Sequence, residues 1–407
     1  MKLQNNGGLS LFSVVPQKKP IDYITEDNLF ERLILNNSEL KKTVISGGNT
    51  FSRNNAVCAL INVLISKHIP VFVLHNSNRA LCNRFNCKNC SGFAPASANH
   101  IVGFDPLANI KPQNAISILS DFGSEFMQIG SEFHCILDIA FEIMDLCNIT
   151  VCTSSVCNFP WSGMAEYVIE NNTISDERKV SLLHRIGAVA SMLPRVQTLF
   201  SELNMRIMRN SNSIDCSEVY GIKDFVINSA VIFADIYSDG NEIISEFYLS
   251  ALKFAKEMGA KFYIVIDSIP VSDTSNNLKH FLKSNDTRAS CMFVSPDVCN
   301  LEDKDFNILT GNGTNVVIFS HSSGISANKW SEYFSEFYYS KCDITMSESK
   351  VNTSFITKTN NRGSTITEER RRCIPPEEII NLPPSRAIVS LGTSNTQCKG
   401  YTTFDFN

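Results

Sequence analysis

The chain has 407 residues, of which 43% are hydrophobic and 19% are charged, and its formal net charge at pH 7 is -5. This composition excludes an intrinsically disordered chain, because the apolar side chains suffice to offset the entropy lost on folding. The charge argues against a wholly basic surface that coats nucleic acid. The length predicts two or three domains, or one larger domain with an insertion.

Strand and helix patterns alternate along most of the chain. In chain order, the expected strands are 43–46, 69–75, 100–104, 230–236, 262–266, 290–294, 315–320 and 387–391, with a Thr/Ser-rich strand and a charged turn after residue 350. The expected helices are 55–67, 241–258, 276–282 and 327–338, with helical patterns also over 112–146 and 158–210. Strands that alternate with helices of about 10 to 15 residues indicate a mostly parallel sheet covered on both faces.

Membrane segments are not expected. No run of about 18 apolar residues without charge occurs, and the first residues lack the long apolar core of a signal peptide. We therefore expect a soluble, intracellular protein that does not insert into a membrane by itself.

The chain has fourteen cysteines. In an intracellular chain of this length they are expected to be reduced core residues rather than disulfide partners. Cys82, Cys87 and Cys90, with His75 and His100 nearby, stand apart because their C-x4-C-x2-C spacing could ligate zinc or an iron–sulfur cluster. No second paired motif follows at the distance of a zinc ribbon, so the metal site is an alternative hypothesis.

A glycine-containing turn lies between the first predicted strand and the first helix, where a phosphate loop with the pattern G-x-x-x-x-G-K-S/T would lie. The turn consists of Gly47, Gly48, Asn49, Thr50, Phe51, Ser52, Arg53 and Asn54. Only the first glycine keeps the register. Ser52 replaces the second glycine, Arg53 replaces Lys with a bulkier planar cation, and Asn54 replaces the hydroxyl that holds Mg2+. The Asn54 carbonyl could still ligate Mg2+ weakly; the alternative is a plain strand-to-helix loop.

The predicted strand over 262–266 is followed by Asp267, which could hold Mg2+ through water. Ser268 follows at the position where motor ATPases place a Glu that activates the attacking water. The pattern predicts a degenerate nucleotide site in which Arg53 and Asp267 are the remaining catalytic groups. The alternative is that Asp267 only caps the turn after its strand.

Segments of residues 22–391 follow one another in an order typical of a known family. They read GGNTFSRNNA, VFVLHN, GFDPL, AVIFADIYSDGNEIISEFYLSALKFAKEMGAKFYIVIDSIP, MFVSPDV, NVVIFSHSSGISANKWSEYF and RRRCIPPEEIINLPPSRAIV. In this joint order the chain resembles the TraG/TraD coupling-protein family of type IV secretion. The resemblance implies a RecA-like P-loop NTPase fold with a mostly parallel sheet and an inserted all-helical domain.

The resemblance also implies a function and partners. Members of the family assemble as hexameric rings that use ATP and Mg2+ to pass DNA or protein through a conjugation or secretion apparatus. It implies a bacterial cytoplasmic protein, peripheral at the inner face of a membrane complex, that forms homo- or hetero-oligomers. Besides the loop changes and Ser268, Val294 stands where the family usually has a Gln before Ser295. These departures favour a scaffold, adaptor or regulator with a degenerate site; an active ATPase motor is the alternative.

The same resemblance predicts how the chain divides into domains. The expected units are an N-terminal segment (1–42), the first part of a RecA-like domain (43–150), a helical insertion (151–225), the second part of the RecA-like domain (226–395) and a C-terminal tail (396–407).

Other residues have both functional and structural interpretations. His75 and His321 end apolar strands, where they could face a nucleotide, but structural histidines are expected. Residues 370–372, all Arg, could supply an arginine finger or contact nucleic acid, whereas a solvated charge run is expected. Trp161 and Trp330 are predicted to be packing residues rather than platforms for bases.

Overall fold

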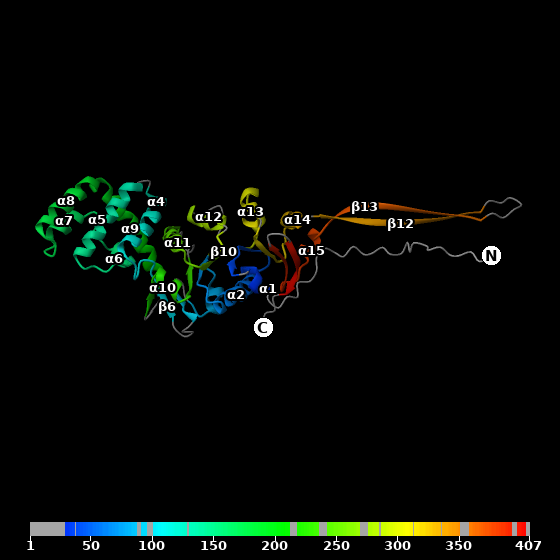
Figure 1. Cartoon of the computed structure of the whole chain (residues 1–407), viewed down its shortest axis with the longest axis horizontal. Coiled ribbons are helices and arrows are strands. Elements are labelled where there is room, and N and C mark those ends of the chain that lie inside the picture. Colours follow the sequence, from blue (N-terminus) through cyan, green and yellow to red (C-terminus); the bar gives the residue numbers. More distant parts are fainter. Residues whose placement is uncertain are drawn as a thin grey trace.

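The fold is described from a computed structural model (Figure 1). The described residues are 29–36, 38–87, 91–95, 101–127, 130–211, 218–235, 242–268, 276–284, 286–311, 313–334, 336–350, 358–392 and 397–403.

An eleven-stranded sheet forms the centre of this described part, in the order β15-β14-β11-β3-β10-β9-β4-β8-β5-β6-β7. The strands from β11 to β8 are all parallel to one another. They are β11 (Asn315–Ile318), β3 (Thr43–Ser46), β10 (Ala289–Ser295), β9 (Phe262–Asp267), β4 (Val71–His75) and β8 (Val231–Asp235). Every residue in them is buried except the last residue of β10. The predicted mostly parallel sheet, covered on both faces, is therefore confirmed.

Antiparallel strands extend the sheet at both sides. β14 pairs with β11, β15 pairs with β14, and β5 joins β8 to β6, with β7 parallel to β6 at the far edge. Their bounds are β14 (Arg386–Gly392), β15 (Gln397–Thr403), β5 (Ser91–Phe93), β6 (Ile101–Phe104) and β7 (Val219–Tyr220). A separate two-stranded sheet joins β1 (Leu35–Asn36) to β2 (Glu39–Leu40).

Helices cover both faces of the sheet, and alternate residues of one strand belong to different cores. Phe72 and Leu74 pack in one hydrophobic cluster, whereas Val71 and Val73 pack in the other. The second cluster contains α1 (Leu29–Ile34), α2 (Thr50–Ser66) and α3 (Arg79–Arg84). The first contains α10 (Ile222–Ile227), α11 (Glu242–Glu257), α12 (Asn276–Lys283), the short helix η4 (Val298–Asn300), α13 (Asp303–Thr310), α14 (Gly324–Tyr333) and α15 (Pro376–Ile380). Figure 1 shows α11 to α14 on one side of the sheet and α1 and α2 on the other.

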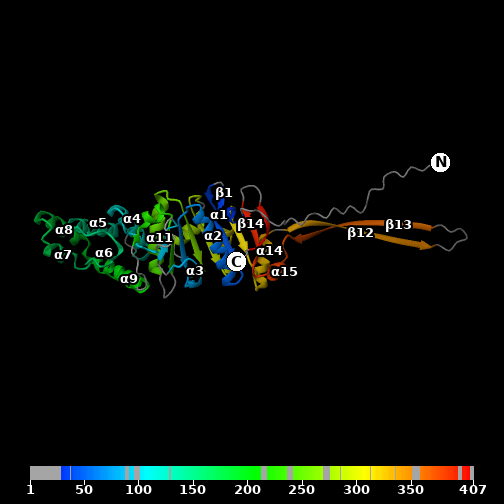
Figure 2. The ribbon, with the colours of Figure 1, turned by 90° about the horizontal axis from the view of Figure 1, so that it is seen from below.

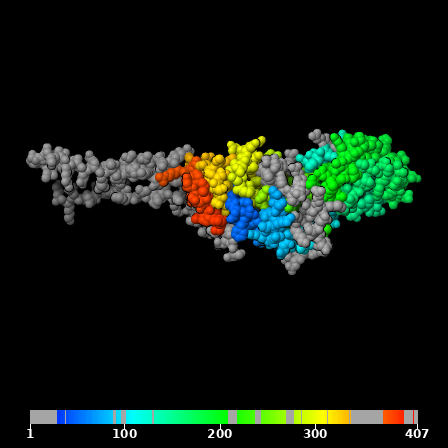
Figure 3. All heavy atoms as spheres, turned by 180° about the vertical axis from the view of Figure 1, so that it is seen from behind, coloured from blue at the N-terminus to red at the C-terminus, as the bar shows by residue number. Residues whose placement is uncertain are grey.

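Further helices form a body at one end of the long axis (Figures 1 and 3). They are α4 (Pro112–Phe126), α5 (Gly130–Leu146), α6 (Thr153–Cys157), α7 (Met164–Glu170), α8 (Asp176–Val189), the short helix η2 (Ala190–Met192) and α9 (Leu193–Ser211). Trp161 is fully buried there, stacks on Phe200 with 4.7 Å between ring centroids, and donates its indole N–H to the Val156 carbonyl. The prediction that Trp161 packs is confirmed. Among the described residues, no helix is both long and apolar enough to cross a bilayer.

A long antiparallel hairpin extends from the opposite end of the molecule (Figures 1 and 2). It pairs β12 (Glu336–Lys350) with β13 (Lys358–Arg372) over fifteen residues in each strand. The predicted helix 327–338 was wrong at its end, because α14 stops at Tyr333 and an aromatic, strand-favouring run begins β12. The three arginines at 370–372 form the last residues of β13.

A buried carboxyl lies between the helical body and the sheet. Glu246 of α11 is 3% exposed; one of its oxygens accepts a hydrogen bond from Asn277 of α12, and the other has no partner in the described part of the chain. Burial raises its pKa to about 8, assisted by Glu125 and Asp121 and opposed by Asn277 and Lys253. Glu246 is therefore mostly protonated at neutral pH.

The pKa of Glu246 makes the stability of the fold depend on pH. At pH values between the unfolded pKa near 4.5 and the folded pKa of about 8, Glu246 keeps its proton in the folded state and has lost it in the unfolded state. The unfolding free energy should therefore fall as pH rises through this window, by at most about 1.4 kcal/mol per pH unit from this group. Urea denaturation from pH 5 to 9 should show that Glu246→Gln reduces this slope. The exposed Glu132→Gln should leave it unchanged, and equal slopes for all three proteins would contradict the assignment.

Candidate phosphate-loop site

The carboxyl ends of the parallel strands meet at one edge of the sheet. β3 ends at Ser46, just before the glycine turn. In β4, His75 lies in register with Asp235 of β8 on one side and with Asp267 of β9 on the other. The sheet therefore brings two acids, a histidine and the glycine turn to one edge, which is where α/β proteins of this kind bind ligands.

The glycine turn is tied to the strands beside β3. Gly47 and Gly48 have φ of 84° and 66°, a left-handed conformation that glycine adopts without strain. The Gly47 N–H donates to the Ser295 carbonyl at 3.3 Å, and the Gly48 N–H donates to the Ser320 carbonyl at 2.7 Å. These two N–H groups, which a phosphate loop would direct at phosphate, are bonded to the ends of β10 and β11.

The His321 side chain packs against the glycine turn and contacts Ser46, the residue before it. Its Nε2 accepts from the Trp330 indole N–H at 3.2 Å and lies 3.0 Å from the Ser46 hydroxyl, while its Nδ1 donates to the Phe319 carbonyl at 3.0 Å. Because an indole can only donate, Nε2 carries no proton and the imidazole is neutral. Burial lowers the His321 pKa, in agreement with this state. A Cβ on Gly47 would lie 2.4 Å from Cε1 of this ring, so glycine is required there. The predictions that His321 is structural and that Trp330 packs are confirmed.

Helix α2 begins at Thr50, five residues before the start at Asn55 that its apolar pattern predicted. The Asn49 side chain caps the helix by accepting from the backbone N–H of Ser52 at 2.8 Å. The Ser52 hydroxyl lies 2.7 Å from the Pro384 carbonyl and is fully buried, so the residue in place of the second glycine ties the loop to the segment before β14. Phe51 is 58% exposed beside the loop, with the Arg84 guanidinium 5.4 Å from its ring centroid.

Arg53 bonds to the loop itself. Its guanidinium donates to the Gly48 carbonyl at 2.6 Å, to the Gly47 carbonyl at 3.2 Å and to the Thr50 hydroxyl at 3.4 Å. The side chain is 6% exposed, and burial lowers its pKa while the charge of Asp267 opposes that shift. The cation that would reach a phosphate is thus held by the carbonyls of its own turn.

Asn78, which the sequence analysis did not single out, links the two predicted Mg2+ ligands. Its side-chain amide exchanges hydrogen bonds with that of Asn54 at 3.1 and 2.8 Å and also donates to the Asp267 carboxylate. The other Asp267 oxygen accepts from the Ser268 hydroxyl at 2.9 Å. The structure therefore brings Asn54 and Asp267 together, as predicted, but through an intervening asparagine. The only signal for Asn78 was its position three residues after the end of β4.

Asp267 is the only acidic residue of β9. Ser268, with φ of 60°, follows it, and Val294 lies directly opposite it in β10, fully buried. The nearest strand-end carboxylate is Asp235, two strands away, and its Oδ1 accepts from the Ser77 N–H at 3.0 Å. Among the described residues, the edge beside Asp267 therefore offers the Ser268 hydroxyl and the Asn78 amide as its nearest polar groups.

His75 lies beside Cys82 at the end of β4. His75 Nδ1 accepts from the Asn78 N–H at 3.2 Å, so its Nε2 carries the proton and lies 3.1 Å from Cys82 Sγ. Burial lowers the His75 pKa and raises the Cys87 pKa to about 12. Cys90 and His100 lie outside the described residues. Among the residues that the structure describes, no three or more His, Cys, Asp or Glu side chains lie close enough together to hold a metal ion. The proposed zinc site stays a prediction.

The sequence and the fold of the chain were compared with those of known proteins. The chain matches neither a protein-family model nor a curated protein sequence. Among solved structures it matches the bacterial conjugative coupling protein TrwB, in a trigonal form with sulphate, with a TM-score of 0.50 and 9% identity over 95% of this chain and 94% of that one. The two chains share one fold. It agrees with the predicted α/β fold, in which a mostly parallel sheet carries an inserted helical body.

Two other matches have lower scores. An unbound monoclinic form of TrwB has a TM-score of 0.48 and 12% identity over 90% of this chain and 85% of that one. VirB4 of Thermoanaerobacter pseudethanolicus has a TM-score of 0.41 and 11% identity over 88% of both chains. At 9% identity, the likeness to the trigonal form of TrwB shows the fold alone.

The Asn78 network should contribute to stability. Asn78→Ala leaves an oxygen of the buried Asp267 without its donor, so the unfolding free energy should fall by about 1–3 kcal/mol. Asn78→Asp keeps a side-chain cap for α3 but places a second carboxylate beside Asp267. It should lower the unfolding free energy at least as much as Asn78→Ala does. The exposed Asn83→Ala should change stability by less than about 0.5 kcal/mol. If urea denaturation finds Asn78→Asp as stable as the unmodified chain, Asn78 serves only as a helix cap.

Proposed function

We propose that the chain is a coupling-protein-like subunit of a conjugation or type IV secretion apparatus whose nucleotide site is degenerate. It acts there as a scaffold, adaptor or regulator at the cytoplasmic side of a bacterial membrane complex, in a homo- or hetero-oligomer. In this proposal the sheet and the helices that cover it form the RecA-like domain, and the helical body from α4 (Pro112–Phe126) to α9 (Leu193–Ser211) is the helical insertion, which begins before the expected 151–225. The fold shared with TrwB over nearly the full length of both chains supports this assignment.

One observation carries the degenerate-site part of the proposal. Arg53, Asn54 and Asp267 are all buried and all hydrogen-bonded to groups of the protein itself. A hydrogen bond to a charged group contributes about 1.5–3 kcal/mol. A nucleotide with Mg2+ would therefore have to replace several such bonds before it gained any contact. The position after Asp267 offers a serine hydroxyl, which does not serve as a base at neutral pH.

An active ATPase motor that moves DNA or protein is the second candidate. The left-handed glycine turn at the start of α2 favours it, because this backbone places a helix N-terminus at the sheet edge where anions bind. TrwB itself has been solved with ADP and Mg2+. Under this candidate, Arg53 would hold phosphate, Asn54 and Asp267 would hold Mg2+, and Asp235 would be the remaining strand-end carboxylate.

Nucleotide binding and turnover separate the two candidates. The purified chain should show no Mg2+-dependent ATP hydrolysis above that of Asp267→Ala, and calorimetry should detect no tight ATP binding. The triple variant Ser52→Gly, Arg53→Lys, Asn54→Thr restores the phosphate-loop pattern and should bind ATP at least about tenfold more tightly, a gain of about 1.4 kcal/mol.

Mg2+-dependent turnover by the unmodified chain that disappears in Asp267→Ala would overturn the degenerate site and favour the motor. A solution mass measured on the same sample tests the oligomer. A chain that is a monomer with and without ATP would contradict the oligomeric part of the proposal.

A further inference from the structure

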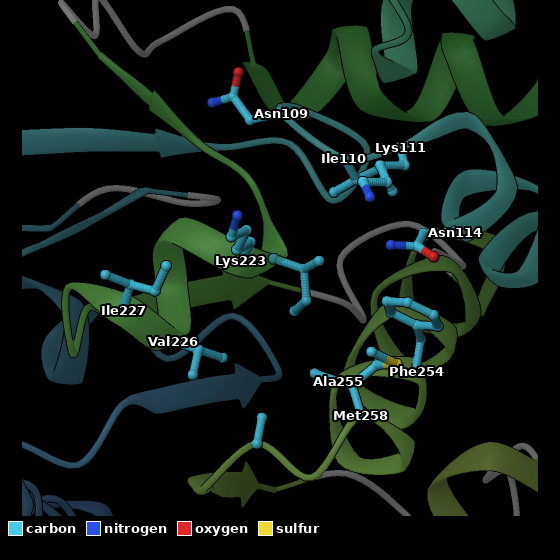
Figure 4. Close-up of a pocket in the computed structure, with 12 residues that line it drawn as sticks. Asn109, Ile110, Lys111, Asn114, Lys223, Val226, Ile227, Phe254, Ala255 and Met258 are labelled. Carbon is cyan, nitrogen blue, oxygen red and sulfur yellow. The ribbon is translucent and has the colours of Figure 1, made fainter.

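A pocket of about 540 Å³ lies away from the phosphate loop. Figure 4 shows it between α10, the last turns of α11 and the loop that leads into α4. Ala260, one of its lining residues, lies just before the start of β9, whereas Asp267 lies at the other end of that strand. The pocket therefore belongs to the opposite edge of the sheet. Its volume is in the range of sites that bind small ligands or a few side chains of a partner.

The walls of the pocket are mainly apolar. Phe254 of α11 and Met258, which directly follows this helix, face Val226 and Ile227 of α10 across it (Figure 4). Two of these side chains are unusually accessible, with Met258 69% exposed and Ile227 65% exposed. The apolar surface thus continues from inside the pocket onto its rim. Large apolar side chains gathered around a cavity in this way are typical of a surface that a partner covers, and methionine adapts well to such partners.

Two lysines lie at the rim of the pocket. Lys111 and Lys223 are exposed and make no ion pair with any residue in the described ranges. Lys111 is also the N-cap residue of the fifteen-residue α4, and its side chain does not cap the helix, so the positive end of the helix dipole adds to the charge. One acid, Asp224, lies nearby and accepts from the neutral Gly221 N–H and Asn109 amide, both at 3.0 Å, so the two lysines outnumber the acids among these rim residues.

We propose that this pocket binds a peptide segment of a partner protein that carries large apolar side chains next to carboxylates. The apolar walls take the side chains, and Lys111 and Lys223 pair with the acidic groups. Charge complementarity excludes a basic segment. The exposed Ile227 and Met258 favour a peptide over a small carboxylic acid, because only a chain that continues past the pocket would cover both rim residues.

Selection from a random library of twelve-residue peptides on the full chain tests the proposal. The expected peptides combine Leu, Phe or Ile with Asp or Glu. Fluorescence anisotropy should show that the double variant Lys111→Glu, Lys223→Glu binds a selected peptide at least about tenfold more weakly than the unmodified chain. Met258→Asp should weaken binding by a similar factor. The exposed lysine variant Lys304→Glu on α13 is the matched control and should bind normally. Replacing the acidic residues of the peptide by Gln or Asn should also weaken binding to the unmodified chain.

Several outcomes would overturn the proposal. They are a library that yields no binder, selected peptides without acidic residues, and binding that survives the double lysine variant. Laurate, a small apolar carboxylate, is the alternative occupant; binding of laurate without any peptide binding would assign the pocket to such a ligand instead. Circular dichroism of each variant confirms that loss of binding is not loss of folding. None of these results depends on whether ATP binds.

Discussion

The parallel alignment of six buried strands is the constraint on which the rest of the structure depends. Strands that run in one direction bring all their carboxyl ends to the same edge, so residues far apart in sequence, such as His75 and Asp267, become neighbours. The same alignment leaves the backbone groups at these strand ends without partners in the ladder. The glycine turn after β3 supplies some of those partners, as its N–H groups bond to the ends of β10 and β11.

This edge is buried, and burial decides how its polar side chains behave. A buried cation or carboxylate must find hydrogen bonds inside the protein or lose its charge. Arg53 finds them in the carbonyls of its own turn, and Asp267 finds them in Asn78 and Ser268. The side chains of Ser52, Arg53 and Asn54 are thus each hydrogen-bonded within the protein.

The sequence predicted the architecture better than the site. Long apolar runs such as 69–75 identified the buried strands because both of their faces are covered. The start of α2 was missed because its first turn is held by a polar cap, Asn49, which apolar periodicity cannot detect. Asn78 and Asp235 were missed for a different reason. Their importance comes from register between strands that are distant in the chain, and that register follows from the sheet order rather than from any local pattern.

The chain has only two tryptophans, and their positions have a practical consequence. Trp161 is buried in the helical body, and Trp330 is buried under the glycine turn of the sheet domain. Each part of the molecule therefore contains one tryptophan with its own surroundings, whose emission can be excited selectively, apart from that of the tyrosines. Replacing either indole by phenylalanine leaves an optical probe that reports on one part alone. The emission of the two single-tryptophan proteins reveals whether the helical body and the sheet lose their structure together or in sequence.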